Sequence, residues 1–236
     1  MKSNQSIKKQ GNLILEILLV LGIMAGVKAI ADYFGLIASG TIGIWSAICV
    51  ATFLLKKRSI SWKDLGAVLP KGRQQWVKQI GLGILAIASI FLITMLVLYV
   101  LKPAFGLEKA ADAADKFRFF IDKPIVLIIY IIIGIWFGAG LGEELLIRGF
   151  LLNHIQKVIG NGKASWVVAL VTQAVIFGFM HSYQGTMGIV ITGLIAFSFG
   201  SFYLLAKRKL FPVVFAHAVF DTLTMVGLYL AESGVQ

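Results

Sequence analysis

The sequence predicts an all-α fold: a polytopic transmembrane helical bundle of about seven spans, forming a single integral-membrane domain over residues 1–236. Of the 236 residues, 58% are hydrophobic and only 14% are charged, whereas soluble domains carry about 25% charged residues. The apolar segments are also long, and a helix needs about 20 mostly apolar residues to cross a bilayer. The candidate spans are residues 13–37, 40–55, 78–101, 124–147, 165–181, 186–206 and 210–231.

The first span follows a basic N-terminus and superficially resembles a signal peptide. Its apolar stretch continues past Met24, and no cleavage site of small residues precedes a soluble domain, so a retained first helix is predicted. Glu16, Lys28 and Asp32 lie near the ends of this span and are interpreted as interfacial charges with no further role. A tight turn at Ser39-Gly40 leads into the second span.

Basic residues between the spans define the orientation. The stretch 56–78 carries seven Lys and Arg residues against Asp64, and the basic N-terminus (Lys2, Lys8, Lys9) and residues 207–209 add more. By the positive-inside rule these segments are cytoplasmic, and the nearly balanced segment 102–123 lies on the opposite face, where an interfacial helix is expected. The N-terminus is therefore predicted to be cytoplasmic in a multi-pass protein of the cell membrane. Since the net charge of +11 is largely explained by topology, no nucleic-acid partner is predicted.

Three groups of polar residues interrupt the later spans. An ionisable side chain at the centre of a membrane helix costs about 2.5–3.5 kcal/mol on insertion scales, so such groups predict a function for the segments that carry them. The groups are Glu143, Glu144 and Arg148, then Phe177 and His181, and finally His217 and Asp221.

In the first group, Glu144 and Arg148 are four residues apart and share a helix face, which predicts an ion pair. Glu143 is rotated by about 100° and is left free to face a cavity. A carboxylate in a low-dielectric setting binds protons more readily, which suits a general base. The alternative is a buried ion-pair cluster that only fixes helix packing. The preceding Gly138, Gly140 and Gly142 permit either close helix approach or a break in the helix.

In the other two groups, each His lies one helical turn from its partner. A lone His such as His181 at the end of a short apolar run is more often a hydrogen-bonded interface residue than a catalyst. The Asp221 carboxylate can hold one ring nitrogen of His217 and orient the other, and Asp221 lies about 16 Å deep at 1.5 Å per residue. Elsewhere, His154 is expected to face solvent, whereas Gln173 and Thr172 are expected to form hydrogen bonds between helices.

The three motifs, in this order on successive spans, resemble the EExxxR, FxxxH and HxxxN or HxxxD signatures of the CPBP family. That family groups CAAX prenyl proteases with bacteriocin-processing and immunity proteins, also called Abi membrane proteins. The resemblance covers roughly residues 120–231. The motifs read Glu143-Glu144-Leu145-Leu146-Ile147-Arg148, Phe177-Gly178-Phe179-Met180-His181 and His217-Ala218-Val219-Phe220-Asp221.

The resemblance implies an intramembrane endopeptidase of the CAAX protease type with residues 120–231 as its catalytic core. Carried over to this chain, Glu143 activates the attacking water with help from His181. His217 and the residue at position 221 stabilise the oxyanion. Glu144, Arg148 and Phe177 support the site. The implied substrate is a hydrophobic or lipidated peptide or protein at the lipid bilayer.

One departure from the family pattern concerns the last motif. CAAX-processing members usually have Asn where this chain has Asp221. An ionised Asp cannot donate to an oxyanion, so Asp221 must be protonated, orient His217 or bind a metal. A metal-free glutamate mechanism without a cofactor is favoured. Zinc held by His181, His217, Glu143 and Asp221 is the alternative, although the chain has no sequence-local zinc signature.

Straight helices would not bring these residues together. Counted from the predicted span ends, Glu143 lies near the cytoplasmic face and His181 toward the far face, about 20 Å apart at 1.5 Å per residue. Catalysis requires both within reach of one water. We therefore expect a broken or re-entrant segment near the active site, either at Gly138–Gly142 or as a tilted, partly inserted helix after Arg148.

Two other classes of function remain open at this stage. A non-catalytic bacteriocin immunity or regulatory membrane protein would bind a membrane-active peptide with the same scaffold but without acid–base residues. A proton-coupled transporter could use buried Glu, His and Asp as a relay, but the sequence has no inverted repeat of the kind many transporters carry.

Overall fold

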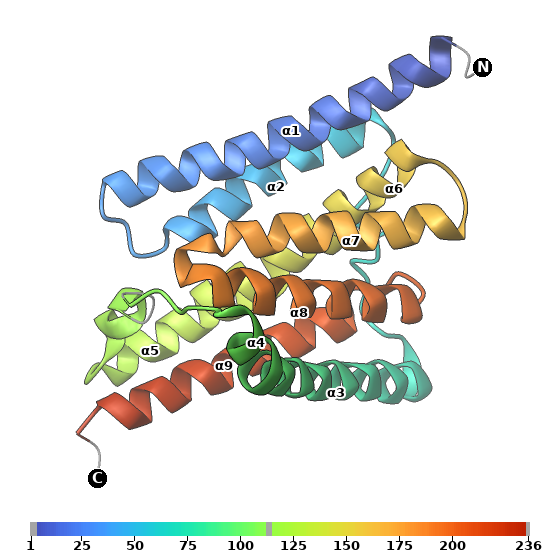
Figure 1. Ribbon diagram of the computed structural model, residues 1–236. Helices are drawn as coiled ribbons and strands as arrows, with labels where there is room; N and C mark the ends of the chain where they lie inside the picture. The colour runs from blue at the N-terminus through green and yellow to red at the C-terminus, as the bar shows by residue number, and fades with distance from the viewer. Residues whose placement is uncertain (1–3, 112–114, 235–236) are drawn as a thin grey trace.

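A computed structural model of the protein describes residues 4–111 and 115–234, and every regular element within these ranges is helical (Figure 1). Seven helices are long and apolar enough to cross a membrane, so the predicted class of multi-pass helical protein and its span count are confirmed. Lys2, one of the residues used for the orientation, lies outside the described ranges. The seven spans are Gly11–Tyr33, Ser39–Lys57, Gly72–Phe105, Pro124–Ile159, Lys163–Met180, Ser182–Leu205 and Phe211–Glu232.

The helical elements follow one another with short connections. The first three spans are α1 (Asn4–Tyr33), α2 (Ser39–Lys57) and α3 (Gly72–Leu96), the last continued by η1 (Val97–Leu101) and α4 (Lys102–Phe105). The fourth span is built from α5 (Pro124–Tyr130), η3 (Ile131–Glu143), η4 (Leu145–Leu152) and α6 (Asn153–Ile159). The remaining spans are α7 (Lys163–Met180), α8 (Gly185–Leu205) and α9 (Phe211–Glu232), and two 3₁₀ turns are η2 (Asp115–Phe120) and η5 (Ser182–Gln184).

Proline and glycine mark several helix ends. Proline stands in the first turn of both α5 and α9, where its fixed φ suits a helix start and its missing N–H has no partner to lose. Gly106 ends α4 in the left-handed conformation with φ 61°, which glycine adopts without steric cost. The short link between α6 and α7 uses Gly160 and Gly162, with φ of 131° and 140°.

The fourth span corrects one sequence expectation. It is neither broken nor re-entrant: the helix runs for 36 residues without interruption, and Glu144 between η3 and η4 has helical φ and ψ of −67° and −38°. The irregular backbone takes the form of π-helical hydrogen bonding over η3 and η4, an i→i+5 pattern that is rare and frequently occurs at functional sites. Because the span ends at Ile159 instead of Ile147, Glu143 lies near its middle and not at the end that is predicted to be cytoplasmic.

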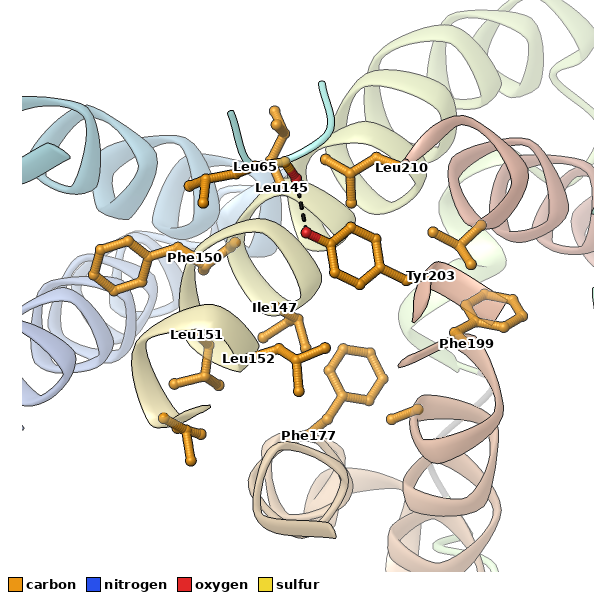
Figure 2. Packing of buried hydrophobic residues seen from close by; sticks show 14 of the residues in the cluster. Leu65, Leu145, Ile147, Phe150, Leu151, Leu152, Phe177, Phe199, Tyr203 and Leu210 are labelled. Carbon is orange, nitrogen blue, oxygen red and sulfur yellow. Dashed lines mark hydrogen bonds between the residues drawn. The ribbon is translucent and has the colours of Figure 1, made fainter. Parts of the chain in front are cut away.

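The bundle is arranged in pairs of neighbouring helices. α1 packs on α2, α7 on α8 and α3 on α9, and the fourth span contacts α2, α7, α8 and α9 (Figure 1). Around η4 the packing is densest. Figure 2 shows the side chains of this segment among those of α7 and α8 and beside Leu65 and Leu210. The residues of η4 drawn there are Leu145, Ile147, Phe150, Leu151 and Leu152. Since lipid is as apolar as these side chains, close van der Waals packing stabilises such contacts.

Candidate active site

A single cavity of about 1030 Å³ collects the residues of all three polar motifs. Its wall includes Glu143 of η3, His181 after α7, and His217 and Asp221 of α9. These four side chains come from three spans that are separate in the sequence. The structure therefore brings together every residue for which the sequence analysis predicted a catalytic role.

Glu144 and Arg148 form the predicted ion pair beside this cavity. Arg148 Nη1 donates to Glu144 Oε1 at 2.9 Å, and both side chains are fully buried. Arg148 Nη2 also donates to the backbone carbonyl of Ala196 in α8 at 3.2 Å. A buried ion pair needs such additional hydrogen bonds to offset the loss of hydration. The pair therefore links the fourth span to α8.

The same Glu144 oxygen also contacts His217. The separation between His217 Nδ1 and Glu144 Oε1 is 2.8 Å, and His217 Nε2 lies 3.4 Å from Asp221 Oδ2. The predicted proximity of Asp221 to a ring nitrogen is thus observed, but the contact of the other nitrogen with Glu144 was missed. Glu144 and His217 are 73 residues apart, so no helical spacing could reveal it. With a carboxylate at each nitrogen, the imidazole has a defined orientation.

Glu143 has the opposite environment. Its side chain is partly buried and faces the cavity, and its Oε2 is buried with no hydrogen-bond partner among the described residues. A buried carboxylate oxygen without a partner is costly. In an open cavity of this size, with His181, His217 and Asp221 also in its wall, the natural partner is water. The two adjacent glutamates therefore differ as expected, one held by an ion pair and the other directed at the cavity.

His181 is held in one tautomer by its own helix end. Its Nδ1 lies 3.0 Å from the carbonyl oxygen of Phe177. A carbonyl only accepts, so Nδ1 must carry the hydrogen and Nε2 is left as an acceptor. The His181 ring also packs on the Phe177 ring, with centroids 4.5 Å apart. The Arg148 guanidinium lies 5.2 Å from the centre of the same Phe177 ring. Phe177 thus joins the ion pair to His181.

Glycine permits the close approach of the helices that carry Glu143 and His217. A Cβ atom on Gly140 would lie 2.8 Å from Cβ of Ala218, and one on Gly142 would lie 2.9 Å from Cγ2 of Ile44. Real Cβ contacts essentially never reach such distances, so larger residues would push η3 away from α9 or α2. Of the two readings offered for these glycines, the structure shows close approach and no break.

Two further sequence interpretations are corrected at the end of the bundle that is predicted to be cytoplasmic. His154 does not face solvent but is 1% exposed, stacked on Phe150 with centroids 3.8 Å apart. Glu16 is no idle interfacial charge, because it forms a salt bridge with Arg58 at 2.8 Å and lies 3.5 Å from His154 Nε2. The local sequence could not show this, because the partners come from α1, the α2 end and α6.

Two polar residues of α7 behave differently from each other. Gln173 Nε2 donates to the Ala196 carbonyl of α8 at 2.9 Å, so the expected bond between helices is present, on the carbonyl that Arg148 also uses. Thr172 instead donates to Val168 of its own helix at 2.8 Å, so that expectation was wrong. Threonine commonly bonds the carbonyl four residues back when it faces lipid or solvent.

A supporting network on the other side of Arg148 was missed by the sequence analysis. The buried Asn153 amide donates to the Arg148 and Gly149 carbonyls, each at 2.9 Å, and contacts the Tyr203 hydroxyl at 3.0 Å. The Tyr203 hydroxyl in turn donates to the Leu65 carbonyl at 2.9 Å (Figure 2). This network serves carbonyls of the π-helical segment and connects it to the loop after α2. In the sequence, this network is indicated only by the presence of Asn153 five residues after Arg148.

The donor set was also compared with the needs of a metal. Among the described residues, no three or more His, Cys, Asp or Glu side chains form a group that could hold a metal ion. The four residues considered for zinc therefore do not form a ligand set in this arrangement.

A multi-pass membrane protein with carboxylates and imidazoles converging on one open cavity has the features of an intramembrane hydrolase. Residues 125–223 match the family model described as type II CAAX prenyl endopeptidase, Rce1-like. The matched segment contains all three motifs, so the CPBP resemblance is confirmed over these residues as a similarity to that family. Neither the curated proteins nor the solved structures give a significant match to the chain.

Proposed function

We propose that this protein is an intramembrane endopeptidase in which Glu143 activates a water molecule to attack a peptide bond. The observation that carries the proposal is the cavity in which Glu143, His181, His217 and Asp221 meet, within the segment that matches the protease family. Glu143 takes the proton of the attacking water and passes it to the leaving amine as the bond breaks. Its unpartnered Oε2 supports this role.

His181 acts beside Glu143 on the same water. Because its Nδ1 hydrogen is engaged by the Phe177 carbonyl, Nε2 offers a lone pair that can accept a hydrogen bond from the water and direct it. This arrangement supports an assisting role in which the imidazole positions the water while Glu143 removes the proton.

His217 stabilises the oxyanion of the tetrahedral intermediate through a ring N–H. Glu144 Oε1 fixes the ring through Nδ1 at 2.8 Å, whereas Nε2 lies 3.4 Å from Asp221 Oδ2, beyond the usual length of an N–H···O hydrogen bond. The Nε2–H is therefore the donor that remains for the oxyanion, and the ring is oriented before the substrate binds, as electrostatic stabilisation of a transition state requires. In this scheme Asp221 does not itself replace the amide donor of the usual Asn. It orients His217, and Glu144 is in turn fixed by Arg148.

The expected orientation places the opening of the cavity outside the cytoplasm. The residues of connecting segments in its wall are 35–38, 109, 116, 117, 119, 183 and 184, which all lie at the same end of the bundle. The Lys- and Arg-rich connections, residues 56–78 and 207–209, lie at the other end (Figure 1). With the basic end in the cytoplasm, the substrate is a membrane-associated peptide or protein whose cleaved segment is reached from the extracytoplasmic side.

The test of function is a comparison of membrane proteomes from cells that carry the wild-type chain or Glu143→Gln. We expect an uncut precursor to accumulate with Glu143→Gln and not with the control Glu108→Gln, an exposed acidic residue outside the cavity. A chain that acts only as an immunity or binding protein would keep its protective effect in Glu143→Gln and leave every precursor unchanged, which would refute the peptidase.

Metal dependence and orientation are measured separately. Bound zinc is determined on purified wild-type chain and on His217→Ala, together with cleavage in the presence of a chelator. For the orientation, the single cysteine is removed by Cys49→Ala, and cysteines are introduced at Leu36 or Lys63. A membrane-impermeant thiol reagent should label Leu36→Cys and not Lys63→Cys in intact cells. The reverse pattern would place the cavity opening in the cytoplasm.

A further inference from the structure

Positive charge is concentrated at the end of the bundle where the Lys- and Arg-rich connections lie. The segments at this end contain fourteen Lys and Arg residues and two acidic residues, Glu16 and Asp64, and residues 1–3 before them add no acidic residue. The segments at the opposite end contain six basic and six acidic residues, Asp112 included. The segments counted are 4–16, 56–78, 157–163 and 207–209 at the basic end, and 28–32, 102–123 and 232–234 at the opposite end (Figure 1). Of the two ends, only the basic end therefore carries a surplus of charge.

Both acidic residues at the basic end already have partners. Glu16 accepts three hydrogen bonds from the Arg58 guanidinium, at 3.0, 2.9 and 2.8 Å. Asp64 Oδ2 accepts hydrogen bonds from the backbone N–H and the hydroxyl of Ser61, at 2.8 and 2.7 Å. In the part of the chain that the structure describes, residues 207–209 form no ion pair. The charges of these three residues are therefore not compensated by a carboxylate there.

Residues 207–209 are three consecutive cations in the turn between α8 and α9. Lys207 and Arg208 have φ of 55° and 60°, a left-handed conformation that residues other than glycine seldom adopt. The Arg208 N–H donates to the Tyr203 carbonyl at 2.8 Å and so caps the end of α8, a motif in which glycine usually takes the left-handed position. Interaction with the negative end of a helix explains one nearby cation. Three cations in a conformation that favours glycine indicate a ligand for their charge.

This turn is fixed against the loop that follows α2. A Cβ atom on Gly66 would lie 2.0 Å from the Arg208 carbonyl oxygen, so only glycine allows the two backbones to approach this closely. The Arg208 guanidinium lies 5.6 Å from the centre of the Trp166 ring, a cation–π contact, and Lys209 Nζ lies 3.4 Å from Gln75 Oε1. The three cations are therefore held together at one place on the surface.

Two tryptophans place the turn at the depth of the lipid headgroups. Trp166 lies near the start of α7, and Trp76 lies near the start of α3 with 37% of its surface exposed. The centre of the Trp76 ring is 5.0 Å from that of Phe211, the first residue of α9. Tryptophan is enriched at the boundary between the hydrocarbon core and water, where its apolar ring and its N–H are both accommodated. The cations of the turn therefore lie beside the phosphate groups of the same leaflet.

We propose that residues 207–209 bind the phosphate group of an anionic phospholipid in the leaflet at the basic end. Charge complementarity supports this partner, and the neighbouring tryptophans favour a lipid over a phosphate compound in solution. The proposal is independent of the peptidase, because none of these three residues lies in the cavity wall. It has a consequence for the site, because the turn leads directly into α9, which carries His217 and Asp221. A lipid bound there stabilises the folded chain by mass action.

The experiment measures the binding of single lipid molecules. The delipidated full-length chain in neutral detergent is titrated with phosphatidylglycerol or with phosphatidylcholine, and native mass spectrometry gives the dissociation constant of the first lipid bound. We expect phosphatidylglycerol to bind more tightly than phosphatidylcholine. Lys207→Gln/Lys209→Gln should weaken the binding of phosphatidylglycerol about five-fold for each lysine removed, which corresponds to about 1 kcal/mol per basic residue near an anionic surface. The binding of phosphatidylcholine should not change.

Two further variants separate the site from general charge and from folding. Lys56→Gln/Lys63→Gln removes the same charge from exposed residues at the same end but outside the turn, so the dissociation constant of the first phosphatidylglycerol should stay close to the wild-type value. Lys207→Gly should raise the thermal stability of the lipid-free chain, because glycine adopts the left-handed conformation without steric cost. The same variant should nevertheless weaken the binding of phosphatidylglycerol about five-fold.

Three results would overturn the lipid site. The first is equal affinity of the wild-type chain for phosphatidylglycerol and phosphatidylcholine. The second is equal affinity of the two double variants for phosphatidylglycerol, which would show that only the diffuse positive charge of this end attracts the lipid. The third is displacement of the bound lipid by soluble glycerol phosphate, which would identify a phosphate compound in solution as the ligand.

Discussion

Replacing Arg148 by an uncharged residue should lower the free energy of unfolding more than any other single substitution near the site. Arg148→Met keeps a long apolar side chain of similar reach but leaves the Glu144 carboxylate, 0% exposed, without its cation. Removing one partner of a buried ion pair costs about 3–5 kcal/mol, because the remaining charge is neither hydrated nor paired. The Ala196 carbonyl loses the bond from Arg148 but keeps that from Gln173, and Glu144 keeps its contact with His217 Nδ1, so we expect the lower part of this range.

The double variant Glu144→Gln/Arg148→Met is the matched control. It removes both charges, and replacing a buried pair by neutral groups is often close to neutral. We therefore expect its free energy of unfolding to lie much nearer the wild-type value than that of Arg148→Met alone. The free energy of unfolding of Arg148→Lys should lie between those of the single and the double variant, since an ammonium group cannot reproduce the bonds of the guanidinium to both Glu144 and Ala196.

The assay is reversible unfolding of the purified chain in mixed micelles, followed by helical circular dichroism, with precursor cleavage measured in parallel. A loss of less than about 1 kcal/mol for Arg148→Met, the range of solvent-exposed pairs, would refute the reasoning. So would a double variant as unstable as the single one, because the cost would then come from lost packing and not from an uncompensated charge.

Three further changes test other parts of the site. Gly140→Val should lower the free energy of unfolding by about 1–3 kcal/mol through overpacking and should reduce cleavage. Adding Ala218→Gly should partly restore both. If it restores neither, the 2.8 Å approach to Cβ of Ala218 is not the cause. Tyr203→Phe should cost about 1–3 kcal/mol in unfolding experiments, because a buried loop carbonyl loses its donor, and an unchanged stability would contradict this. Asp221→Asn should keep measurable cleavage if the residue only orients His217, whereas Asp221→Leu should lose it; equal rates for the two variants would exclude the orienting role.

The sequence predicts the fold well because bilayer thickness imposes a simple rule on helix length. All seven spans follow from apolar segments of sufficient length. The fourth span was predicted to end at Ile147, just before the polar residues Arg148, Asn153 and His154. They do continue it, since Glu144, Tyr203 and Glu16 satisfy them from distant parts of the chain.

The candidate site shows the same division between local and distant information. Contacts at helical spacing could be predicted, such as those of Glu144 with Arg148 and of His217 with Asp221, because four residues make about one turn. The contact of Glu144 with His217 and the position of Phe177 between Arg148 and His181 depend on helix packing. The difficulty of bringing Glu143 and His181 together disappeared once the span was longer than expected.

Among the described residues, the wall of the cavity includes connecting segments from one end of the bundle only, and this has a consequence for the cell. None of the described residues in its wall belongs to the connections at the basic end, and the tightly packed side chains around η4 lie between (Figure 2). Water can therefore reach the middle of the bilayer without a continuous aqueous path from one compartment to the other. The protein can admit the water that the proposed hydrolysis requires, while the membrane keeps its ion gradients and its electrical potential.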